Sequence, residues 1–134
     1  MMNKTIVIIG ASTGIGKALV YEAAKNNDFN VIAFARKTDL MESSFESLQN
    51  VSCHFLDLEN LNAQEFTETL QQYEPIDILI NNAGYLVNKP FKDLDQNDLI
   101  KSFQINTIGI MEITKLCMPY LNNNFSHIVN ISSM

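Results

Sequence analysis

The stretch TIVIIGASTGIGKALV, residues 5–20, decides the fold of this 134-residue chain. It begins with a run of β-branched residues, TIVIIG (5–10), which predicts a buried strand. A glycine-rich turn follows, and after the turn we expect a helix from Gly14 to Asn26. The apolar residues expected on one side of this helix are Ile15, Ala18, Leu19 and Ala23. A strand that enters a helix through a short glycine turn is typical of the first unit of an α/β fold.

Four further runs have the same apolar character as the first strand. They are residues 30–35, 51–57, 76–81 and 127–132. Each is nearly continuous in apolar residues, as parallel strands are when helices cover both faces of the sheet. Helical stretches separate the runs, so strand and helix alternate along the chain. This order predicts an α/β fold: one Rossmann-type domain over residues 1–134, with a doubly wound parallel sheet of about five strands and helices on both faces.

Three helical segments are expected between the later strands. Residues 63–73 turn Phe66 and Leu70 inward, and residues 40–49 form either a helix or an irregular crossover. A long helix is predicted from about 96 to 121, and its apolar residues are spread too widely for one stripe: Leu99, Ile100, Phe103, Ile105, Ile108, Ile110, Met111, Ile113, Leu116 and Met118. A helix that is apolar on more than one side is buried on more than one side. We therefore expect one face on the sheet, and another face on a second subunit of a homo-oligomer or on a part of the fold not present here.

The composition limits the classes of partner. The formal net charge of −6 argues against a nucleic-acid partner, which would require a basic face. No apolar run approaches the ~20 residues of a membrane span, and the first residues have the pattern of a strand and not of a secretory signal. We therefore expect a cytoplasmic protein without a membrane segment. Cys53, Cys117, His54 and His127 form no metal-ligand spacing, so we expect reduced thiols and no metal site.

The charges are unevenly distributed along the chain. Residues 1–38 carry five lysine or arginine residues against two acidic residues, whereas the remaining residues carry four against thirteen. A basic N-terminal part on an acidic protein indicates that an anion is held there. Chance clustering of the charges is the alternative.

The glycine turn is the first candidate binding site. Gly10, Gly14 and Gly16 have the spacing Gly-x-x-x-Gly-x-Gly between a strand and a helix. Glycines here permit a tight turn and let the backbone approach a bulky anion. The helix that begins near Gly14 directs free N–H groups and about half a positive charge at that anion, and Ser12 and Thr13 add hydroxyl donors. The pattern predicts dinucleotide binding, with glycines that serve only close packing as the alternative.

The end of the second strand indicates which dinucleotide is preferred. The sequence there is AFARK, with Arg36 and Lys37 directly after the strand and no acidic residue before Asp39. A guanidinium group pairs with a 2′-phosphate through a charge-assisted hydrogen bond, whereas a carboxylate would repel the phosphate. We therefore expect NADP in preference to NAD. Two cations merely solvated at a strand end are the alternative.

Together with these features, several motifs make the chain resemble the short-chain dehydrogenases/reductases, which are NAD(P)-dependent oxidoreductases with a Rossmann-type fold. The resemblance runs from Thr5 to the end of the chain. It rests on motifs in the order of the family: GASTGIG (10–16), LDL (56–58), NNAG (81–84), FQINTIG (103–109) and IVNISS (128–133). It implies hydride transfer between NADP(H) and a carbonyl or alcohol group of a small-molecule substrate.

The resemblance also implies roles for individual residues. Asp57 would accept a hydrogen bond from the adenine amino group with Leu58 beside the ring, although a turn-forming aspartate is the alternative for Asp57. Asn81 would tie the central strands together. The cofactor contacts implied by the motifs are Gly10, Ser12, Thr13, Gly14, Ile15, Gly16, Arg36, Lys37, Asp57, Leu58, Asn82, Ala83 and Gly84.

Two catalytic residues are implied in the same way. Asn106 would bend the long helix and hold a water molecule of the proton relay. An asparagine inside an apolar helix that bonds only a neighbouring carbonyl is the alternative. Ser133, in preference to its neighbour Ser132, would hydrogen-bond the carbonyl or alcohol oxygen of the substrate.

The family also uses a Tyr-x-x-x-Lys pair on a helix beyond the serine. Tyr85 and Lys89 have this spacing, but they are expected on a loop and are a false match. We therefore expect this chain to be the N-terminal part of a reductase, truncated before that motif, and to have no substantial activity alone. A non-catalytic NADP(H)-binding module and a structural partner subunit are the alternatives.

Overall fold

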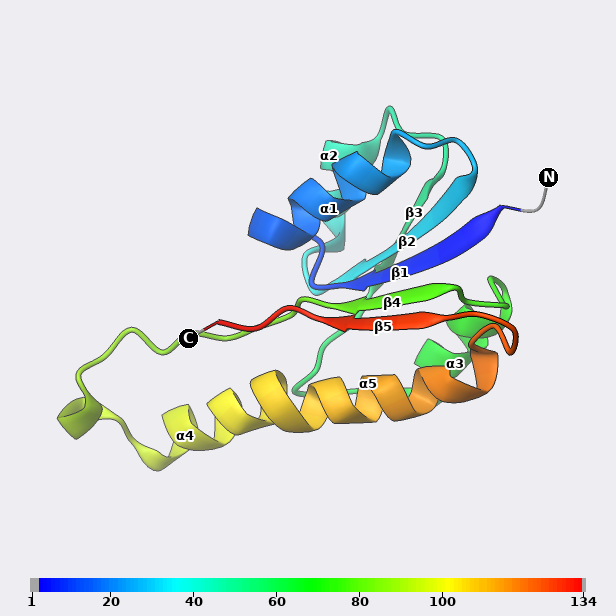
Figure 1. Ribbon diagram of the computed structural model, residues 1–134. Coiled ribbons are helices and arrows are strands. Elements are labelled where there is room, and N and C mark those ends of the chain that lie inside the picture. The colour runs from blue at the N-terminus through cyan, green and yellow to red at the C-terminus, as the bar shows by residue number, and fades with distance from the viewer. Residues whose placement is uncertain (1–2, 134) are drawn as a thin grey trace.

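The computed structural model describes residues 3–133, which form a parallel sheet with helices on both faces (Figure 1). The strands are β1 (Lys4–Ile9), β2 (Phe29–Ala35), β3 (Val51–Phe55), β4 (Ile78–Asn81) and β5 (His127–Asn130). Their spatial order is β3-β2-β1-β4-β5, and every neighbouring pair is parallel. The predicted Rossmann-type sheet of five strands is therefore confirmed.

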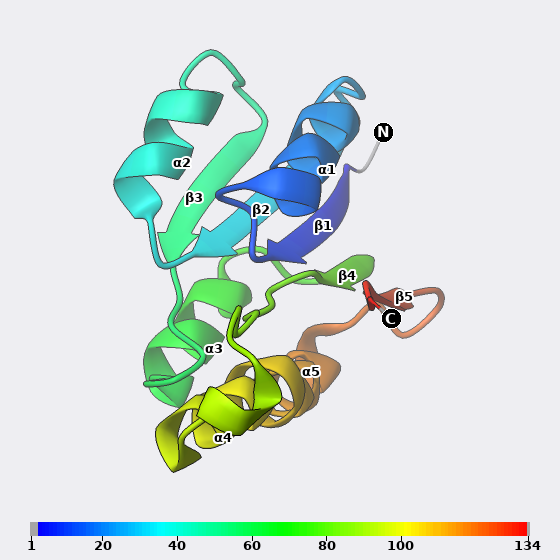
Figure 2. The same ribbon diagram turned by 90° about the vertical axis from the view of Figure 1, so that its left-hand side faces the viewer.

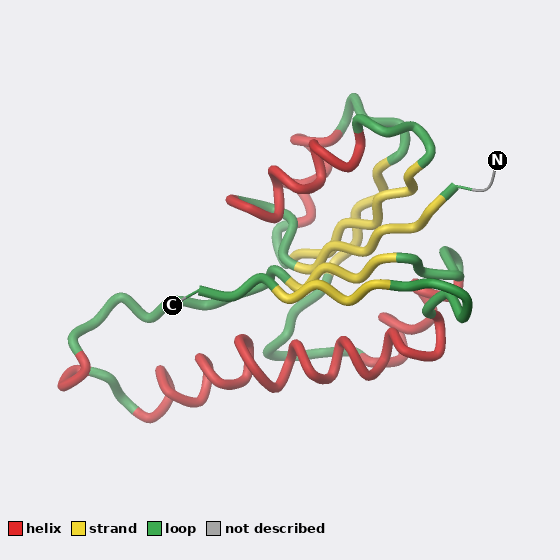
Figure 3. The backbone as a smooth tube through the Cα atoms, in the orientation of Figure 1, coloured by secondary structure: helices red, strands yellow, loops and turns green. Residues whose placement is uncertain are grey.

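The helices alternate with the strands, as predicted. They are α1 (Gly14–Ala24), α2 (Thr38–Phe45), α3 (Ala63–Gln71), α4 (Gln96–Phe103) and α5 (Gly109–Cys117), and the shorter helical segments are η1 (Phe91–Asp93), η2 (Gln104–Ile108) and η3 (Met118–Tyr120). The segment for which the sequence left a choice between a helix and an irregular crossover is the helix α2. Figure 3 shows how loops connect these elements at the two ends of the sheet.

The sheet separates two apolar cores. In β1, Ile6 and Ile8 point to the side of α1 and α2, whereas Val7 and Ile9 point to the side of α3 and α5. This alternation follows from the strand, in which successive side chains point to opposite faces. All four side chains are at most 4% exposed, so β1 is covered on both faces.

Helix α1 is rotated relative to the sequence expectation. Ile15 is 60% exposed and Ala18 is also exposed, whereas the buried residues are Gly16, Val20 and Ala24. The expected face was therefore wrong in its N-terminal half. The reason is the contact of Gly16 with the turn after β1, described below, which fixes which side of the helix faces the sheet. In α3, Phe66 and Leu70 are buried as predicted.

The long helix predicted over residues 96–121 is helical from Gln96 to Tyr120, but it changes its geometry in the middle. Segment η2 is a π-helix, and no residue of α4 before it is buried. From η2 onward, one buried stripe with a spacing of four residues packs against the sheet: Ile105, Gly109, Ile113 and Cys117. The face of α4 and α5 that carries Leu99, Ile100, Phe103, Ile108 and Met111 is exposed. The expected contact of this face with a second subunit stays a prediction.

Strand β5 forms the edge of the sheet beside β4. All four of its residues are exposed, and Ile128 and Val129 keep 42% and 39% of their surface in contact with solvent. The apolar run predicted as the last strand is thus present at the edge of the sheet. It is held by its ladder with β4, in which Asn81 lies opposite Asn130.

Candidate functional site

A cleft opens at the carboxyl ends of the strands, which face the viewer in Figure 2. It lies where the chain leaves β1 toward α1 on one face of the sheet and leaves β4 toward α4 on the other face. Such a reversal between adjacent strands is the usual ligand site of open α/β sheets. The cleft has a volume of about 230 Å³ and is lined by Ile9, Gly10, Ser12, Thr13, Phe34, Ala35, Arg36, Lys37, Leu56, Asp57, Leu58, Asn82, Ala83, Gly84 and Ile105. All the residues predicted to contact a cofactor are in this lining except Gly14, Ile15 and Gly16.

The turn after β1 places its backbone against the loop after β4. Gly10 has a φ of +86°, which L-residues with a Cβ atom rarely adopt. A Cβ atom here would lie 2.6 Å from both the Cα and the N atom of Ala83. The N–H groups of Gly10 and Ala11 both donate to the carbonyl of Phe34 on β2, at 2.8 and 3.1 Å. The turn is therefore fixed to both neighbouring strands and forms one wall of the cleft.

Gly16 stands behind this wall. A Cβ atom at Gly16 would lie 2.0 Å from the carbonyl oxygen of Gly10 and 2.5 Å from Nδ2 of Asn82. The same Asn82 amide donates to the Gly10 carbonyl at 3.0 Å. Gly16 thus serves close packing, which is one of the two roles that the sequence left open for the glycines. Gly14 has a φ of +59° and open space where a Cβ atom would be.

The N-terminus of α1 points toward the cleft with no negative charge of its own. Thr13 precedes the helix without a side-chain capping hydrogen bond, and no acidic residue lies in the first turn. The partial positive charge of the helix end is therefore not neutralised locally. Ser12 and Thr13 line the cleft beside this end.

Arg36 and Lys37 follow directly after β2, and both are exposed at the cleft. Among the described residues that line the cleft, the acidic one is Asp57, which follows β3. Its Oδ1 atom accepts a hydrogen bond from the N–H of Glu59 at 2.9 Å, and its Oδ2 atom accepts one from Asn60 at 3.4 Å. Asp57 therefore forms a turn and also lines the cleft, so the two roles considered for it are compatible.

Asn81 ends β4 and connects it to its neighbours. Its Nδ2 group donates to Oδ1 of Asn130 on β5 at 2.9 Å and to Oγ1 of Thr114 on α5 at 3.1 Å. The predicted tie is therefore present, but it joins β4 to the edge strand β5 and to α5 and not two central strands. Asn81 is 2% exposed, and within residues 3–133 its Oδ1 atom is a buried oxygen without a hydrogen-bond partner.

Asn106 lies at the centre of the π-helical segment η2 and is exposed, in contrast to the buried amide expected from the sequence. Its Oδ1 atom accepts a hydrogen bond from the N–H of Tyr85 at 2.7 Å, and its Nδ2 group donates to the carbonyl of Tyr85 at 2.8 Å. Asn106 therefore pairs with both backbone groups of the residue that follows Gly84. The π-helical geometry of η2 is an irregularity at Asn106, while the bend and the water contact expected for Asn106 stay predictions.

Ser133 lies at the same end of the sheet, beyond β5. The N–H of Ile131 donates to the carbonyl of Asn81 at 2.9 Å, so the segment after β5 begins beside the loop after β4. Ser132 and Ser133 are exposed, and neither belongs to the lining of the cleft. The structure therefore brings the predicted cofactor residues together, while Ser133 lies outside that group.

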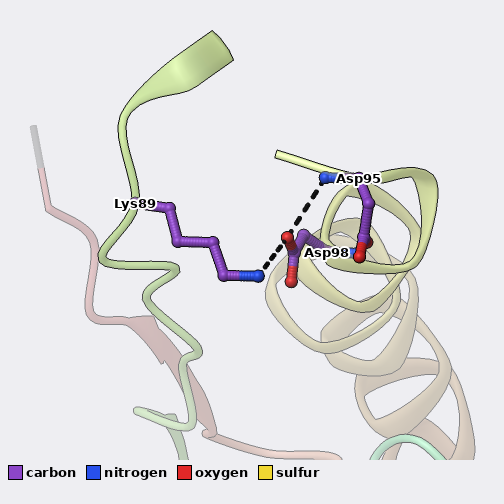
Figure 4. A network of polar contacts seen from close by, with 3 residues as sticks. All are labelled: Lys89, Asp95 and Asp98. Atoms are coloured by element: carbon purple, nitrogen blue, oxygen red, sulfur yellow. Dashed lines mark hydrogen bonds and ion pairs between the residues drawn. The ribbon is translucent and has the colours of Figure 1, made fainter. Parts of the chain in front are cut away.

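Tyr85 and Lys89 lie on the loop after β4, as expected for a false match. Lys89 instead forms an ion pair with Asp98 at 2.7 Å, and the Asp98 carboxylate also accepts a hydrogen bond from the N–H of Asp95 at 3.2 Å (Figure 4). Asp95 and Asp98 form a capping box at the start of α4. The hydrogen bond from Lys89 lowers the pKa of Asp98, and the same bond raises the pKa of Lys89.

Sequence reasoning missed the apolar floor of the cleft. It consists of Ile9, Phe34, Ala35, Leu56 and Ile105. Most of these are the last apolar residues of strands, or follow one directly, and that position is the signal that could have identified them. Phe34 is 1% exposed, and its ring packs edge-on against the ring of Phe66 with 5.1 Å between the ring centroids.

Within residues 3–133, no group of three or more His, Cys, Asp or Glu side chains has the arrangement of a metal site. In the same residues, no helix combines the length and the apolar character that crossing a membrane requires.

Comparison with known proteins identifies the family. The profile of the short chain dehydrogenase family matches residues 4–134. The 3-amino-tetrahydro-pyrrolizinone reductase of Xenorhabdus hominickii is 33% identical over 99% of this chain and 46% of its own length. The NADP-dependent 3-hydroxy acid dehydrogenase of Schizosaccharomyces pombe is 32% identical over 98% of this chain and 54% of its own length.

The fold comparison agrees with the sequence comparison. A short-chain dehydrogenase from Streptomyces avermitilis superposes with a TM-score of 0.87 at 24% identity, over 99% of this chain and 50% of that structure. The chain spans about half the length of the curated relatives that it matches. With the strand order, the glycine turn and the motifs in register, this protein belongs to the short-chain dehydrogenase family.

Proposed function

We propose that this chain forms the NADP(H)-binding part of an oxidoreductase that transfers hydride between NADP(H) and a carbonyl or alcohol substrate. The observation that carries the proposal is the position of Arg36 and Lys37, two cations at the edge of the cleft directly after β2. An adenosine ribose with a 2′-phosphate carries negative charge at this place. A guanidinium group matches that phosphate with two parallel donors.

The remaining wall of the cleft suits the rest of a dinucleotide. The Gly10 turn and the N-terminus of α1 would hold the pyrophosphate, because free N–H groups and a partial positive charge are directed there. Asp57 and Leu58 would bind the adenine, and Asn82, Ala83 and Gly84 would lie along the ribose and phosphates. The apolar floor around Phe34 offers surface to the rings.

The bound dinucleotide would supply or accept the hydride. In this proposal, Ser133 hydrogen-bonds the substrate oxygen and Asn106 keeps the loop after β4 in place. The name of the yeast relative states NADP dependence, which agrees with the preference inferred from Arg36 and Lys37. The proposed substrates are carbonyl or alcohol compounds, the class that the resemblance to the family implies.

The cofactor preference is tested by titrating the purified chain with NADPH and NADH and following the nicotinamide fluorescence. We expect tighter binding of NADPH. Arg36→Ala should weaken NADPH binding by about 10- to 100-fold, the loss of a charge-assisted contact of about 1.5–3 kcal/mol, and should leave NADH binding nearly unchanged.

Lys25→Ala is the matched control for this experiment. Lys25 follows α1 at the end opposite to the cleft, and its exposed ion pair with Glu22 at 2.6 Å is remote from Arg36. The control should bind NADPH like the wild type. Tighter binding of NADH than of NADPH by the wild-type chain would refute the proposed preference, and binding of neither would refute the cofactor site.

A further inference from the structure

A bridge of three side chains lies beside the cleft and connects two of its walls. It consists of Glu59 on the loop after β3, Lys101 on α4 and Tyr85 on the loop after β4, and we call it the Lys101 bridge. Lys101 Nζ lies 3.5 Å from Oε2 of Glu59 and 4.5 Å from the centre of the Tyr85 ring. One ammonium group thus makes an ion pair and a cation–π contact with two loops that are separate in the sequence.

Each end of the bridge adjoins the lining of the cleft. Glu59 follows Asp57 and Leu58, and its own N–H group is the donor to the Asp57 carboxylate at 2.9 Å. Tyr85 follows Gly84, another residue of the lining. The bridge therefore connects the wall after β3 to the wall after β4.

Two side-chain amides of η2 contact the same two loops about one turn further along the helix. Asn106 holds both backbone groups of Tyr85, at 2.7 and 2.8 Å. Gln104 donates from Nε2 to the carbonyl of Leu58 at 3.2 Å. The helix formed by α4 and η2 therefore contacts each of the two loops twice. One contact is a hydrogen bond from a side-chain amide of η2 to the loop backbone, and the other is made by Lys101.

We propose that Lys101 is a positioning residue for the dinucleotide: it holds the Leu58 wall and the Gly84 wall of the cleft at the separation that binds the cofactor. This inference rests on the proposed function of the cleft. The side chains of Lys101 and Glu59 are 34% and 31% exposed, so solvent screens the ion pair only in part. A single ion pair at the surface contributes little to the free energy of folding. The effect of the bridge should therefore appear in the cleft and not in global stability.

The bridge itself is tested without any cofactor, by amide hydrogen exchange measured with NMR. The N–H of Tyr85 is hydrogen-bonded to Asn106 and should exchange slowly in the wild type. In Lys101→Met, which keeps the length of the stem and removes the charge, exchange at Tyr85 should be about three- to tenfold faster, as expected for the loss of a contact of this strength. Amides of β1 should not change.

The consequence for binding is tested by NADPH titration. Lys101→Met should weaken NADPH binding by about three- to tenfold, with an unchanged unfolding midpoint in the absence of NADPH. Lys101→Arg should restore most of the affinity, because a guanidinium group makes the same ion pair and the same contact with the ring. Lys25→Met, which removes the exposed ion pair with Glu22, is the control and should change neither readout.

Two further variants keep the proposal testable if Lys101→Met fails to fold. Glu59→Gln and Tyr85→Leu each remove one contact of the bridge and should each give part of the same effect. Unchanged exchange at Tyr85 in the variants that keep this residue, Lys101→Met and Glu59→Gln, would overturn the inference, as would unchanged NADPH affinity in variants with faster exchange. If the wild type binds no NADPH, the proposed function fails, whereas the exchange experiment still decides whether the bridge fixes the loop.

Discussion

Strands β1 and β5 both pair with β4 and have similar apolar sequences, but they differ in what covers them. In β1, the side chains from Ile6 to Ile9 are at most 4% exposed. In β5, Ile128 and Val129 are 42% and 39% exposed. The sequences TIVII and HIVNI would be assigned to the same kind of strand from composition alone. The difference shows that an apolar run predicts a strand, while its burial depends on which helices pack against it.

The same difference in burial separates two parts of the molecule. The part around β1 carries the cleft, and its turn, its helix and the loop after β4 are in close backbone contact. The part around α4 and β5 presents apolar side chains to solvent. Substitutions of equal chemistry should therefore have unequal effects in the two parts.

The largest difference is expected from truncating an isoleucine in each strand. Ile8 is fully buried, so Ile8→Ala should lower the free energy of unfolding by about 3–4 kcal/mol through lost burial and the remaining cavity. Ile128→Ala should lower it by about 1 kcal/mol or less, because much of that side chain is already in water. Urea denaturation of both variants measures the difference, and equal losses would break the comparison.

A smaller effect is expected at the glycine behind the cleft. In Gly16→Ala, the new Cβ atom meets backbone at 2.0 Å, which must move, and the cost should be about 2–3 kcal/mol with loss of NADPH binding. Gly14→Ala is the matched variant, because its new Cβ atom meets no atom within 4 Å. The only cost there is the backbone strain of an alanine at a φ of +59°. Thermal unfolding and NADPH titration of both variants check this order; a larger loss in Gly14→Ala would contradict it.

A pH effect of about 1 kcal/mol is expected from the buried thiol of Cys117. Burial raises the pKa of Cys117 from an ordinary 9.0 to about 12. In the unfolded chain the thiol loses its proton near pH 9, whereas in the folded chain it keeps it, so stability falls as pH rises from 9 toward 12.

Urea denaturation at pH 8 and pH 10 should therefore show a loss of about 1 kcal/mol from this group. The fall should be smaller in Cys117→Ala, which lacks the thiol. An equal pH dependence in the two proteins would exclude this cause.

The smallest effect on stability is expected at the sheet edge. Val129→Lys places a charge on the exposed strand and should change the free energy of unfolding by less than about 1 kcal/mol. It should reduce self-association, because a charge on an edge strand opposes pairing with other chains. Light scattering as a function of protein concentration measures this, and association unchanged from the wild type would show that β5 is not the contact.

The sequence was sufficient for the sheet because each strand is a run of apolar residues between turn-forming residues. It also located most of the cleft, since Gly10, Arg36, Asp57 and Asn82 all follow strands and the carboxyl ends of parallel strands meet at one edge. For these four residues, a position directly after a strand was therefore enough to predict a position in the cleft.

What could not be predicted depends on packing between distant segments. The exposure of Ile15 follows from the contact of Gly16 with Gly10 and Asn82, which periodicity does not contain. The pairing of Asn106 with Tyr85 joins residues that are 21 positions apart. The periodicity of apolar residues also assumes a regular α-helix, and the π-helical segment η2 departs from that geometry.

The π-helical segment η2 has a consequence for how residues 96–117 can be altered. An α-helix advances by about 100° per residue, and a π-helical turn contains an additional residue. Deleting one residue between Gln104 and Ile108 would therefore remove this additional residue, restore a regular α-helix and leave the downstream half nearly in its present orientation relative to α4. A helical wheel that assumes 100° per residue throughout residues 96–117 therefore assigns the residues of one half to the wrong side of the helix.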